Sequence, residues 1–491
     1  MTSRLEKRIL ERCIRCEGEK SFWWQNTWWS RRVLSDLSAR CEKVLKDAGL
    51  GEGSRLAVLL PNSPLFIALM IAVWKLGGVL VPLNLLAGKT AIGSNLKHAD
   101  VAGAVLPQGM EQAAEDFAGI GIPTVTAPLD GPLPGFKCRA VDGSDPDTAV
   151  IFYTSGTTGA PKGVPISHAN LLENIEASTG HLTDLREDDI FLNALPNFHA
   201  LGFNVSGLLP LVGGFPQVLL PSFMPAENAL HAIHSAGVTV IVAVPTMVNL
   251  LLGTVTRGAT PPSTLRMIIS GGDKLPAKID ARAEKMLGLG VLEGYGLTET
   301  SPVVSVNPNY ASRKPGTAGT ILPGYDVQIR SSDGKVLPPG KEGTLWLRGP
   351  SVFGEYFRDQ HQTEERIRDG WFNTGDVVRM DDEGYLSILD RESDIIIVGG
   401  FNVYPAEVES VLQEVPGVRE SAVVGVSHSV SGEIVKACVV KDPDSGIQAR
   451  DIISFCRENL ALYKVPRLVE FVDELPRSNI GKVLRRELRS G

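Results

Sequence analysis

One twelve-residue stretch concentrates the residue types that bind phosphate, with four Ser or Thr hydroxyls, three glycines and one lysine. Hydroxyls can donate hydrogen bonds to phosphate oxygens, glycines let backbone N–H groups approach, and lysine adds positive charge. The stretch is not a Walker A loop, which requires G-x-x-x-x-G-K-[ST], because Pro161 precedes Lys162 and no Ser or Thr follows. It predicts a phosphate loop of another kind. The residues concerned are Thr154, Ser155, Gly156, Thr157, Thr158, Gly159 and Lys162.

Three further groups of polar residues each follow a predicted strand. Glycine-rich turns after strands are common, and a lone histidine beside phenylalanine is more often packing than catalysis, so no single group is decisive. In open α/β sheets, however, ligands bind outside the carboxyl ends of the strands. All four groups are therefore candidates to converge on one crevice. The three groups are 196–203, with His199, after 191–195; 270–273 after 267–269; and 293–300 after 291–292.

These groups, taken in order with three later motifs, resemble the adenylate-forming superfamily of acyl-CoA synthetases, peptide-synthetase adenylation domains and luciferases. The matches run in the family's order from residue 153 to residue 488, whereas residues 1–150 match by their α/β pattern alone. The motifs are YTSGTTGAPKGV, PNFHALGF, EGYGLTET, WFNTGD, DRESDIIIVGGFNVYPAEVE and PRSNIGKVLRREL.

The resemblance implies a large N-terminal AMP-binding domain, residues 1–390, and a mobile C-terminal lid, residues 391–491. It also implies two half-reactions, in which a carboxylate attacks the α-phosphate of ATP to release pyrophosphate and a thiol then displaces AMP. The phosphate loop would hold the β- and γ-phosphates, which leave together. Because one rigid lid cannot serve both steps, a rotation near 391–394 is expected. Family members usually carry Asp or Lys at the position of Ser393, whereas this chain has a small residue that can still absorb a change in backbone torsion.

The resemblance also assigns catalytic roles. Glu299 is implied as the Mg²⁺ ligand, since a hard cation prefers oxygen ligands, and Thr298 as a contact of the α-phosphate. Lys482 resembles the lysine that bridges the carboxylate and the α-phosphate, where preorganised charge accelerates such reactions by roughly 10²–10³. His199 resembles the residue beside the acyl site.

Nucleotide and CoA contacts are implied in the same way. Tyr295 would stack on adenine, Asp376 would accept hydrogen bonds from the ribose hydroxyls, and Arg391 would reach the nucleotide. The glycines assigned to these ligands are Gly271, Gly272 and Gly296 at the adenine slot, and Gly399 and Gly400 in the lid loop along the pantetheine path.

The substrate acid is expected to be hydrophobic. Peptide-synthetase relatives carry an acidic residue near the His199 motif to hold the substrate amine, whereas this chain has no Asp or Glu from Ile190 until Glu227. A free carboxylic acid is therefore favoured. The apolar run 205–212, with Gly202 beside it, and the segment 242–245 predict an apolar pocket for a fatty acid. Core packing is the alternative explanation of these runs.

CoA is the favoured thiol, because residues 450–491 carry nine Arg or Lys against six Asp or Glu and could meet its phosphates. The same basic surface could meet an acyl carrier protein, and an aryl acid could replace the fatty acid. A luciferase-like oxidoreductase or a non-catalytic nucleotide-binding protein is less favoured, since Lys162, Glu299 and Lys482 are all retained.

Hydrophobic patterns predict the elements that must position these residues. From residue 54 to about 300, short aliphatic runs alternate with helical patterns, which indicates α/β units with largely parallel sheets. The runs predicted as strands include 55–60, 79–81, 240–244 and 267–269. After residue 310, hairpin signals such as Asp333-Gly334 predict a β-rich subdomain over about 310–390. A small α+β unit follows, with one helix that begins at Pro405. The predicted fold class is α/β, with a β-rich subdomain and an α+β lid.

Composition restricts the remaining classes. The 491 residues carry a net charge of −8, which argues against a nucleic-acid binder. The charged N-terminus lacks the apolar segment of a signal peptide, and the longest apolar run, 65–74, is too short to span a bilayer. We expect a buried helix there, capped by Asn62 or Ser63. Six cysteines in so long a chain are not a disulfide framework, so a cytoplasmic location is predicted. The predicted ligands are ATP, Mg²⁺, CoA and a carboxylic acid, while an acyl carrier protein and a homodimer are left open.

Overall fold

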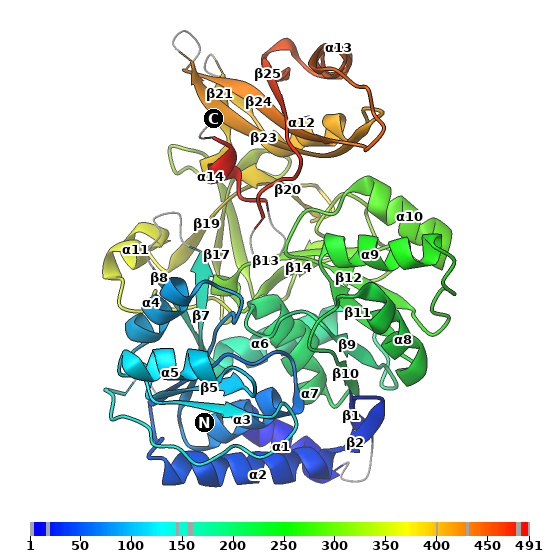
Figure 1. Cartoon of the computed structure of the whole chain (residues 1–491). Coiled ribbons are helices and arrows are strands. Elements are labelled where there is room, and N and C mark those ends of the chain that lie inside the picture. The colour runs from blue at the N-terminus through cyan, green and yellow to red at the C-terminus, as the bar shows by residue number, and fades with distance from the viewer. Residues whose placement is uncertain are drawn as a thin grey trace. The chain divides into compact units, whose positions relative to one another are not determined.

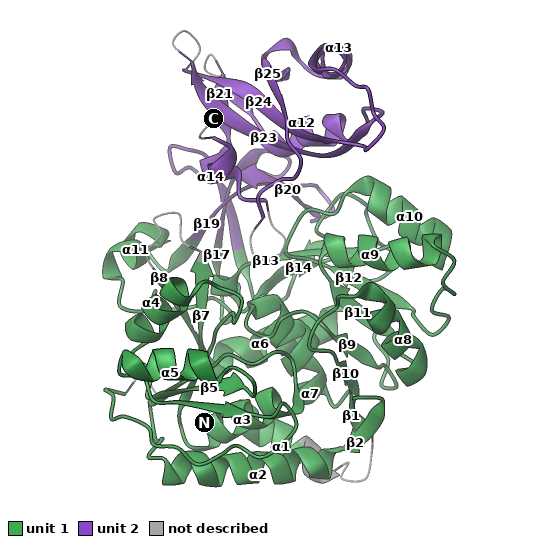
Figure 2. Cartoon of the chain, in the orientation of Figure 1, with its two compact units in different colours: residues 1–326, 347–372 green, residues 327–346, 373–491 purple. Residues whose placement is uncertain are grey.

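The computed structural model describes most of the chain (Figure 1). It divides into two compact units: unit 1 comprises residues 1–326 and 347–372, and unit 2 comprises residues 327–346 and 373–491 (Figure 2). The domain boundary at residue 390 stays a prediction. The described residues are 4–15, 20–143, 147–155, 161–398, 401–428, 432–477 and 483–489.

Unit 1 contains a six-stranded sheet in the order β6-β5-β3-β4-β7-β8. All neighbouring strands run parallel except β7 and β8, which form an antiparallel pair. Thr154 lies opposite Lys162 in this pair, so the hairpin carries both ends of the predicted phosphate loop. The strands are β3 (Arg55–Val58), β4 (Val79–Pro82), β5 (Gly103–Pro107), β6 (Thr124–Ala127), β7 (Thr148–Ser155) and β8 (Pro161–Ser167).

Unit 1 also contains a nine-stranded sheet in the order β15-β14-β13-β12-β11-β9-β10-β1-β2. Strands β9, β11, β12 and β13 are parallel neighbours, so their carboxyl ends lie along one edge. The polar groups that follow β9, β12 and β13 share that edge, as predicted. The strands are β1 (Lys20–Trp24), β2 (Thr27–Ser30), β9 (Phe191–Asn193), β10 (Gln217–Leu219), β11 (Val240–Ala243), β12 (Met267–Ser270), β13 (Leu292–Gly296), β14 (Val303–Val306) and β15 (Thr320–Ile321).

Helix α3 (Pro64–Lys75) confirms the predicted buried helix. Its residues 64–74 are all buried, and the Ser63 hydroxyl caps it by accepting a hydrogen bond from the Phe66 N–H. The other helices of unit 1 are α1 (Leu5–Arg15), α2 (Arg31–Asp47), α4 (Lys89–Ala99), α5 (Glu111–Gly119), α6 (His168–His181), α7 (Leu209–Gly213), α8 (Ala226–Ala236), α9 (Pro245–Thr256), α10 (Ala277–Leu287) and α11 (Gln360–Arg366).

A π-helix, η1 (Leu201–Leu208), follows the His199 motif and continues into α7. The sequence did not predict it, because its largely apolar residues show no helical period. The Phe203 ring packs edge-on against Phe152 of β7 at 5.3 Å and against Phe66 of α3 at 6.3 Å between ring centres. These rings fix the π-helix against β7 and α3. Such π-helical turns often occur at functional sites.

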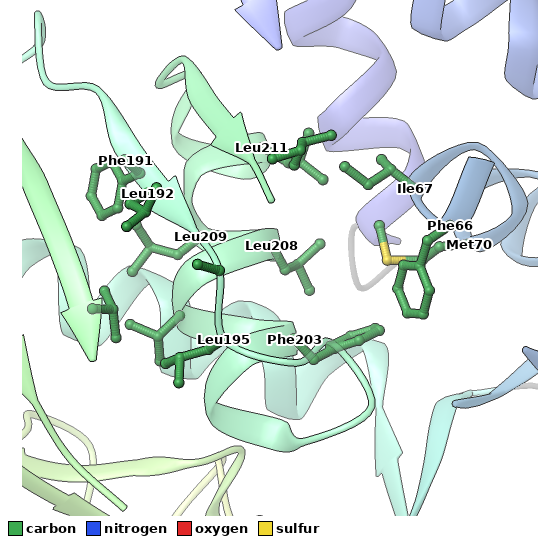
Figure 3. Close-up of a cluster of buried hydrophobic side chains, with 14 of the residues drawn as sticks. Phe66, Ile67, Met70, Phe191, Leu192, Leu195, Phe203, Leu208, Leu209 and Leu211 are labelled. Atoms are coloured by element: carbon green, nitrogen blue, oxygen red, sulfur yellow. The ribbon is translucent and has the colours of Figure 1, made fainter. Parts of the chain in front are cut away.

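The apolar run 205–212, a predicted wall of the substrate pocket, packs mainly into the core. Its large side chains other than the partly buried Val212 are at most 7% exposed, and Figure 3 shows several of them in one cluster with side chains of α3. Gly202 faces backbone rather than a pocket, because a Cβ there would lie 2.3 Å from the Pro196 carbonyl oxygen. The core alternative therefore explains this run. The core residues concerned are Val205, Leu208, Leu209 and Leu211.

Residues 326–391 carry five strands, as expected for the predicted β-rich subdomain. Strands β16 to β20 form a sheet in the order β16-β17-β19-β18, with β20 beside β19, and most of it belongs to unit 2. The strands are β16 (Asp326–Arg330), β17 (Glu342–Arg348), β18 (Ile367–Arg368), β19 (Trp371–Met380) and β20 (Leu386–Arg391).

The predicted α+β part of unit 2 has a second sheet, in the order β22-β21-β24-β23 with β25 beside β24. Helix α12 (Pro405–Leu412) begins at the predicted proline and buries Val408 and Leu412. The other elements are β21 (Ile396–Val398), β22 (Phe401–Val403), β23 (Val418–His428), β24 (Gly432–Lys441), β25 (Leu468–Phe471), α13 (Ala449–Asn459) and α14 (Arg485–Leu488).

Candidate active site

The phosphate loop begins and ends on the β7–β8 hairpin. Thr154 and Lys162 are cross-strand neighbours, and the ladder closes with Ser155 opposite Pro161. The structure thus places the first threonine and the lysine of the loop, while their contact with phosphate stays a prediction. The loop residues outside the described part of the chain are Gly156, Thr157, Thr158 and Gly159.

Lys162 meets Glu299, the predicted Mg²⁺ ligand. The lysine Nζ lies 3.5 Å from the Glu299 Oε1. Glu299 stands on the 3₁₀ turn η2 (Thr298–Thr300), close after β13, and is 9% exposed. Two of the predicted polar groups, one from each sheet of unit 1, therefore come together.

Tyr356 belongs to the same cluster and was not predicted from the sequence. Its hydroxyl donates a hydrogen bond to the Glu299 Oε1 at 2.9 Å, and its ring centre lies 4.0 Å from the Lys162 Nζ. The tyrosine itself is 2% exposed. The amino-acid sequence gives no signal of these contacts, because Tyr356 lies 57 positions from Glu299 and outside the family motifs.

A single buried carboxylate beside a lysine fits a magnesium–triphosphate complex. Mg²⁺ at nucleotide sites is usually bound through one or two carboxylates plus substrate phosphates, rather than by an all-protein cage. Among the residues that the structure describes, no three or more His, Cys, Asp or Glu side chains gather into a metal-binding group. The cluster is therefore suited to a cation that arrives with its nucleotide.

The turn that carries Glu299 is held by buried polar side chains. The Asn174 Nδ2 of α6 donates to the Thr300 carbonyl at 3.2 Å and to the Val303 carbonyl at 2.8 Å. The Tyr325 hydroxyl donates to the Thr300 carbonyl at 2.8 Å. The side-chain Nδ2 of Asn204, in the π-helix, donates to the Ser301 carbonyl. Because buried backbone groups need partners, these bonds stabilise the turn in one conformation.

The three glycines assigned to the adenine slot differ in why the fold would require glycine at each position. Gly272 has φ +82°, a left-handed conformation that L side chains rarely adopt. A Cβ on Gly271 would make ordinary contacts with the Gly294 carbonyl oxygen, at 3.4 Å, and with the Leu201 side chain, at 3.8 Å. A Cβ on Gly296 would lie 1.9 Å from the Pro302 carbonyl oxygen, so Gly296 is required by packing. Tyr295 lies on β13 opposite Ser305 and is half-buried, and its stacking on adenine stays a prediction.

His199 lies at the entrance to the π-helix. Its side chain is half-buried, and its Nδ1 accepts a hydrogen bond from the Leu201 N–H at 3.4 Å. Beneath it, the buried Asn62 side chain donates to the Leu195 carbonyl at 2.7 Å and accepts from the Asn197 N–H at 2.9 Å. Asn62 thus braces the segment that carries the histidine.

Unit 2 brings together two predicted nucleotide residues. Arg391 Nε lies 3.0 Å from the Asp376 Oδ1, across the β19–β20 ladder. Asp376 is 3% exposed, so it is a buried carboxylate with a cationic partner. The predicted residues of this unit outside the described part of the chain are Gly399, Gly400 and Lys482.

The predicted hinge residue Ser393 lies in a 3₁₀ turn, η3 (Glu392–Asp394). Arg489 holds this turn: its Nη2 donates to the Ser393 carbonyl at 3.1 Å and to the Asp394 Oδ1 at 2.9 Å. The small side chain at 393 is compatible with this contact, and its part in a rotation stays a prediction.

Glu293, the first residue of the EGYGLTET motif, is a second residue whose role was not predicted from the sequence. Its Oε1 accepts a hydrogen bond from the Leu275 N–H at 3.0 Å, and burial raises the pKa of this carboxyl to about 7. It lines a cavity of about 160 Å³, together with Asp280 and Arg313, which form an ion pair at 2.7 Å. The sequence predicted that Glu293 follows the strand 291–292, whereas it lies on β13, so the sequence gave no sign of this environment.

The described part of the chain contains no helix that is both long and apolar enough to cross a membrane.

Comparison with known proteins identifies the family. Residues 10–357 match the AMP-binding enzyme family, and residues 407–482 match the AMP-binding enzyme C-terminal domain. The chain therefore belongs to the AMP-binding enzyme family. This membership confirms the predicted adenylate-forming superfamily.

Two curated relatives differ in how much of their length is matched. A long-chain-fatty-acid–CoA ligase of Yersinia pestis is 40% identical over 345 residues, which cover 70% of this chain and 61% of that protein. A feruloyl-CoA synthase of Amycolatopsis sp is 36% identical over 467 residues, which cover 93% of this chain and 92% of that protein. The chain thus spans less than two thirds of the first relative and nearly all of the second.

Two solved structures share the fold. ATP-bound MatB from Rhodopseudomonas palustris has a TM-score of 0.90 at 32% identity, covering 100% of this chain and 98% of that one. The O-succinylbenzoate Coenzyme A synthetase of Bacillus subtilis, in complex with ATP and magnesium, has a TM-score of 0.87 at 30% identity, covering 98% of this chain and 99% of that one. These similarities confirm the predicted α/β fold with a small C-terminal domain.

Proposed function

We propose that the chain is an AMP-forming acid–thiol ligase that joins a hydrophobic carboxylic acid to CoA. The observation that carries the proposal is the meeting of Lys162 with Glu299 in unit 1, at 3.5 Å. One group is suited to phosphate and the other to a hard cation. The family membership and the relatives that are named CoA ligases support the same conclusion.

In the first half-reaction, a carboxylate oxygen of the acid attacks the α-phosphorus of ATP, and the bond to the β-phosphate breaks to release pyrophosphate. Lys162 and Thr154 would hold the leaving phosphates, and Thr298 would contact the α-phosphate. Glu299 would hold Mg²⁺, which neutralises phosphate charge when bound. These roles place fixed positive charge where negative charge develops.

In the second half-reaction, the CoA sulfur attacks the acyl carbonyl carbon of the adenylate, and AMP leaves. We propose that Lys482 serves the first step alone, and that Asp376, Arg391 and Tyr295 hold the nucleotide through both. His199 would stand beside the acyl group.

The acid is proposed to be either aliphatic or aryl. The fatty-acid ligase and the feruloyl-CoA synthase among the relatives support one choice each. Leu201 and Val244 lie close to the Gly271–Gly272 pair, where a Cβ on Gly272 would touch both side chains within 3.6 Å. Apolar side chains thus border the predicted adenine slot. The hydrophobic acid is supported by these two relatives and by the lack of Asp or Glu from Ile190 until Glu227.

Acyl carrier protein is the alternative acceptor, and a homodimer stays a prediction. We further propose a cytoplasmic location, which the free thiols of the four described cysteines support. They are Cys41, Cys138, Cys438 and Cys456.

The test measures products from ATP with acetate, decanoate and ferulate, offering CoA or acyl carrier protein as acceptor. AMP and pyrophosphate are expected with decanoate or ferulate, and acetate should be the poorest acid, because each buried methylene contributes about 0.8 kcal/mol. Release of ADP and phosphate alongside acyl-CoA would overturn the mechanism. If acetate equals or exceeds both decanoate and ferulate in kcat/KM, the hydrophobic acid is overturned.

A further inference from the structure

Tyr356 touches both members of the Lys162–Glu299 pair. Its hydroxyl reaches the carboxylate Oε1 at 2.9 Å, while its ring face lies under the ammonium group at 4.0 Å. The ring and the hydroxyl therefore act on opposite charges, which lie 3.5 Å apart. A tyrosine can do both because it combines an aromatic face with a hydrogen-bond donor.

The segment 353–357, which carries this tyrosine, is attached at two points. The Phe353 N–H donates to the Glu299 carbonyl at 2.9 Å, and the Phe357 N–H donates to the Gly163 carbonyl of β8 at 2.9 Å. The segment thus connects the turn of the carboxylate with the strand of the lysine.

The tyrosine side chain is fixed by its own neighbours. The backbone N–H of Tyr356 donates to the Thr363 hydroxyl of α11 at 2.9 Å, and the tyrosine ring packs edge-on against Phe353 at 4.7 Å between ring centres. Phe353 packs in turn against Phe372 at 5.3 Å. A side chain held this way has few alternative rotamers, so it can impose its position on its partners.

We propose that Tyr356 is a positioning residue that sets the separation and direction of Lys162 and Glu299 for magnesium-bound triphosphate. This inference rests on the proposed function, because it assigns the pair to ATP. The residue does not itself contact reacting atoms. Its hydroxyl directs the carboxylate toward the cation, and its ring holds the ammonium at the phosphates.

The main test compares Tyr356→Phe, which keeps the ring, with Tyr356→Leu, which removes both contacts. ATP binding is measured by calorimetry with and without Mg²⁺, and AMP release is measured across a magnesium titration. Tyr356→Phe should need about tenfold more Mg²⁺ for half-maximal binding, as expected for loss of a hydrogen bond to a charged group. Its affinity for ATP without Mg²⁺ should stay unchanged. Tyr356→Leu should also weaken ATP binding without Mg²⁺.

Tyr310→Phe is the matched control. The hydroxyl of the half-buried Tyr310 accepts a hydrogen bond from the Ile268 N–H at 3.0 Å, and no contact joins it to the Lys162–Glu299 pair among the interactions described above. It should lower thermal stability without changing the magnesium requirement. If Tyr356→Phe behaves like Tyr310→Phe in both measurements, Tyr356 is merely structural and the proposal is overturned.

A second experiment keeps the proposal testable even if the variants lose stability. Tyr356→Phe is combined with Glu299→Gln, and the magnesium dependence of ATP binding is compared across the four proteins. An effect of the tyrosine that disappears in the Glu299→Gln background supports action through the carboxylate, and an undiminished effect overturns it. Failure of the ligase assay with every acid would refute the proposed function, while the ATP-binding experiments would still decide the role of Tyr356.

Discussion

At the scale of single residues, the cluster around Glu299 shows what a motif can and cannot reveal. Lys162 was predictable from the residue types of its loop, and Glu299 from the resemblance of its motif to the adenylate-forming superfamily. Tyr356 was not predictable, because its role depends on contacts with residues distant in sequence. Residue type gives chemistry, but only the fold gives proximity.

Gly296 illustrates the opposite case, in which a residue expected to bind ligand has a packing role that can be tested. Gly296→Ala should lower the free energy of unfolding by roughly 3 kcal/mol or more, because the new Cβ would overlap the Pro302 carbonyl oxygen and force the backbone to shift. Denaturant unfolding measures the change. Gly135→Ala is the control, since a Cβ there meets nothing within 4 Å. Equal stability of the two variants would contradict the packing argument.

At the scale of elements, the positions of the buried strands were predictable, whereas the π-helix and the order of strands in the sheets were not. Short aliphatic runs gave β3, β4, β11 and β12 within a residue or two, because buried parallel strands are apolar on both faces. The same all-apolar composition concealed the π-helix, whose core packing could not be distinguished from a pocket wall. Strand order was also beyond the sequence, since it depends on contacts between distant segments.

Asn174 connects helix α6, the π-helix and the turn that carries Glu299. Its loss should therefore destabilise the packing of all three. Asn174→Ala leaves the Thr300 and Val303 carbonyls without this donor, and it should lower the free energy of unfolding by about 2–4 kcal/mol. AMP release should also fall, because the turn carries Glu299. Asn309→Ala, which removes hydrogen bonds at the surface rather than in the core, is the comparison and should have a smaller effect on both quantities. Unfolding curves and initial rates of AMP release together measure both effects, and an unchanged rate in a destabilised Asn174→Ala protein would separate the turn from catalysis.

At the scale of the whole molecule, the buried carboxyl of Glu293 makes stability depend on pH. Its pKa is raised from 4.5 to about 7 by burial, so the unfolded chain loses this proton at lower pH than the folded chain. The contribution to stability is complete below pH 4.5 and is lost as pH rises toward 7. Glu293→Gln should therefore flatten the fall in melting temperature between pH 4.5 and 7 relative to the parent protein. Parallel curves for the two proteins would show that Glu293 titrates normally.

Lys482 tests the predicted division of labour between the two half-reactions. Lys482→Ala should reduce acyl-adenylate formation by roughly 10²–10³, because a positioned charge is lost from the first step. The same variant should convert supplied acyl-adenylate and CoA to acyl-CoA at close to the parent rate. Rapid-quench measurement of each half-reaction distinguishes the outcomes, and an equal loss in both would mean that the lysine is structural.

The division into units was only partly foreseen. The change from α/β to β-rich texture after residue 310 was visible in the turn residues, and the small α+β part after residue 391 was also visible. The sequence did not show that residues 373–390 belong to the same compact unit as this α+β part. Membership of a unit follows from contacts within the fold rather than from local composition.

The grip of Arg489 on the turn at Ser393 has a practical consequence for handling the protein. Carboxypeptidase trimming that removes Arg489 would take away both hydrogen bonds to the turn at which the lid is predicted to rotate. Assays of the two half-reactions therefore need material that retains Arg489.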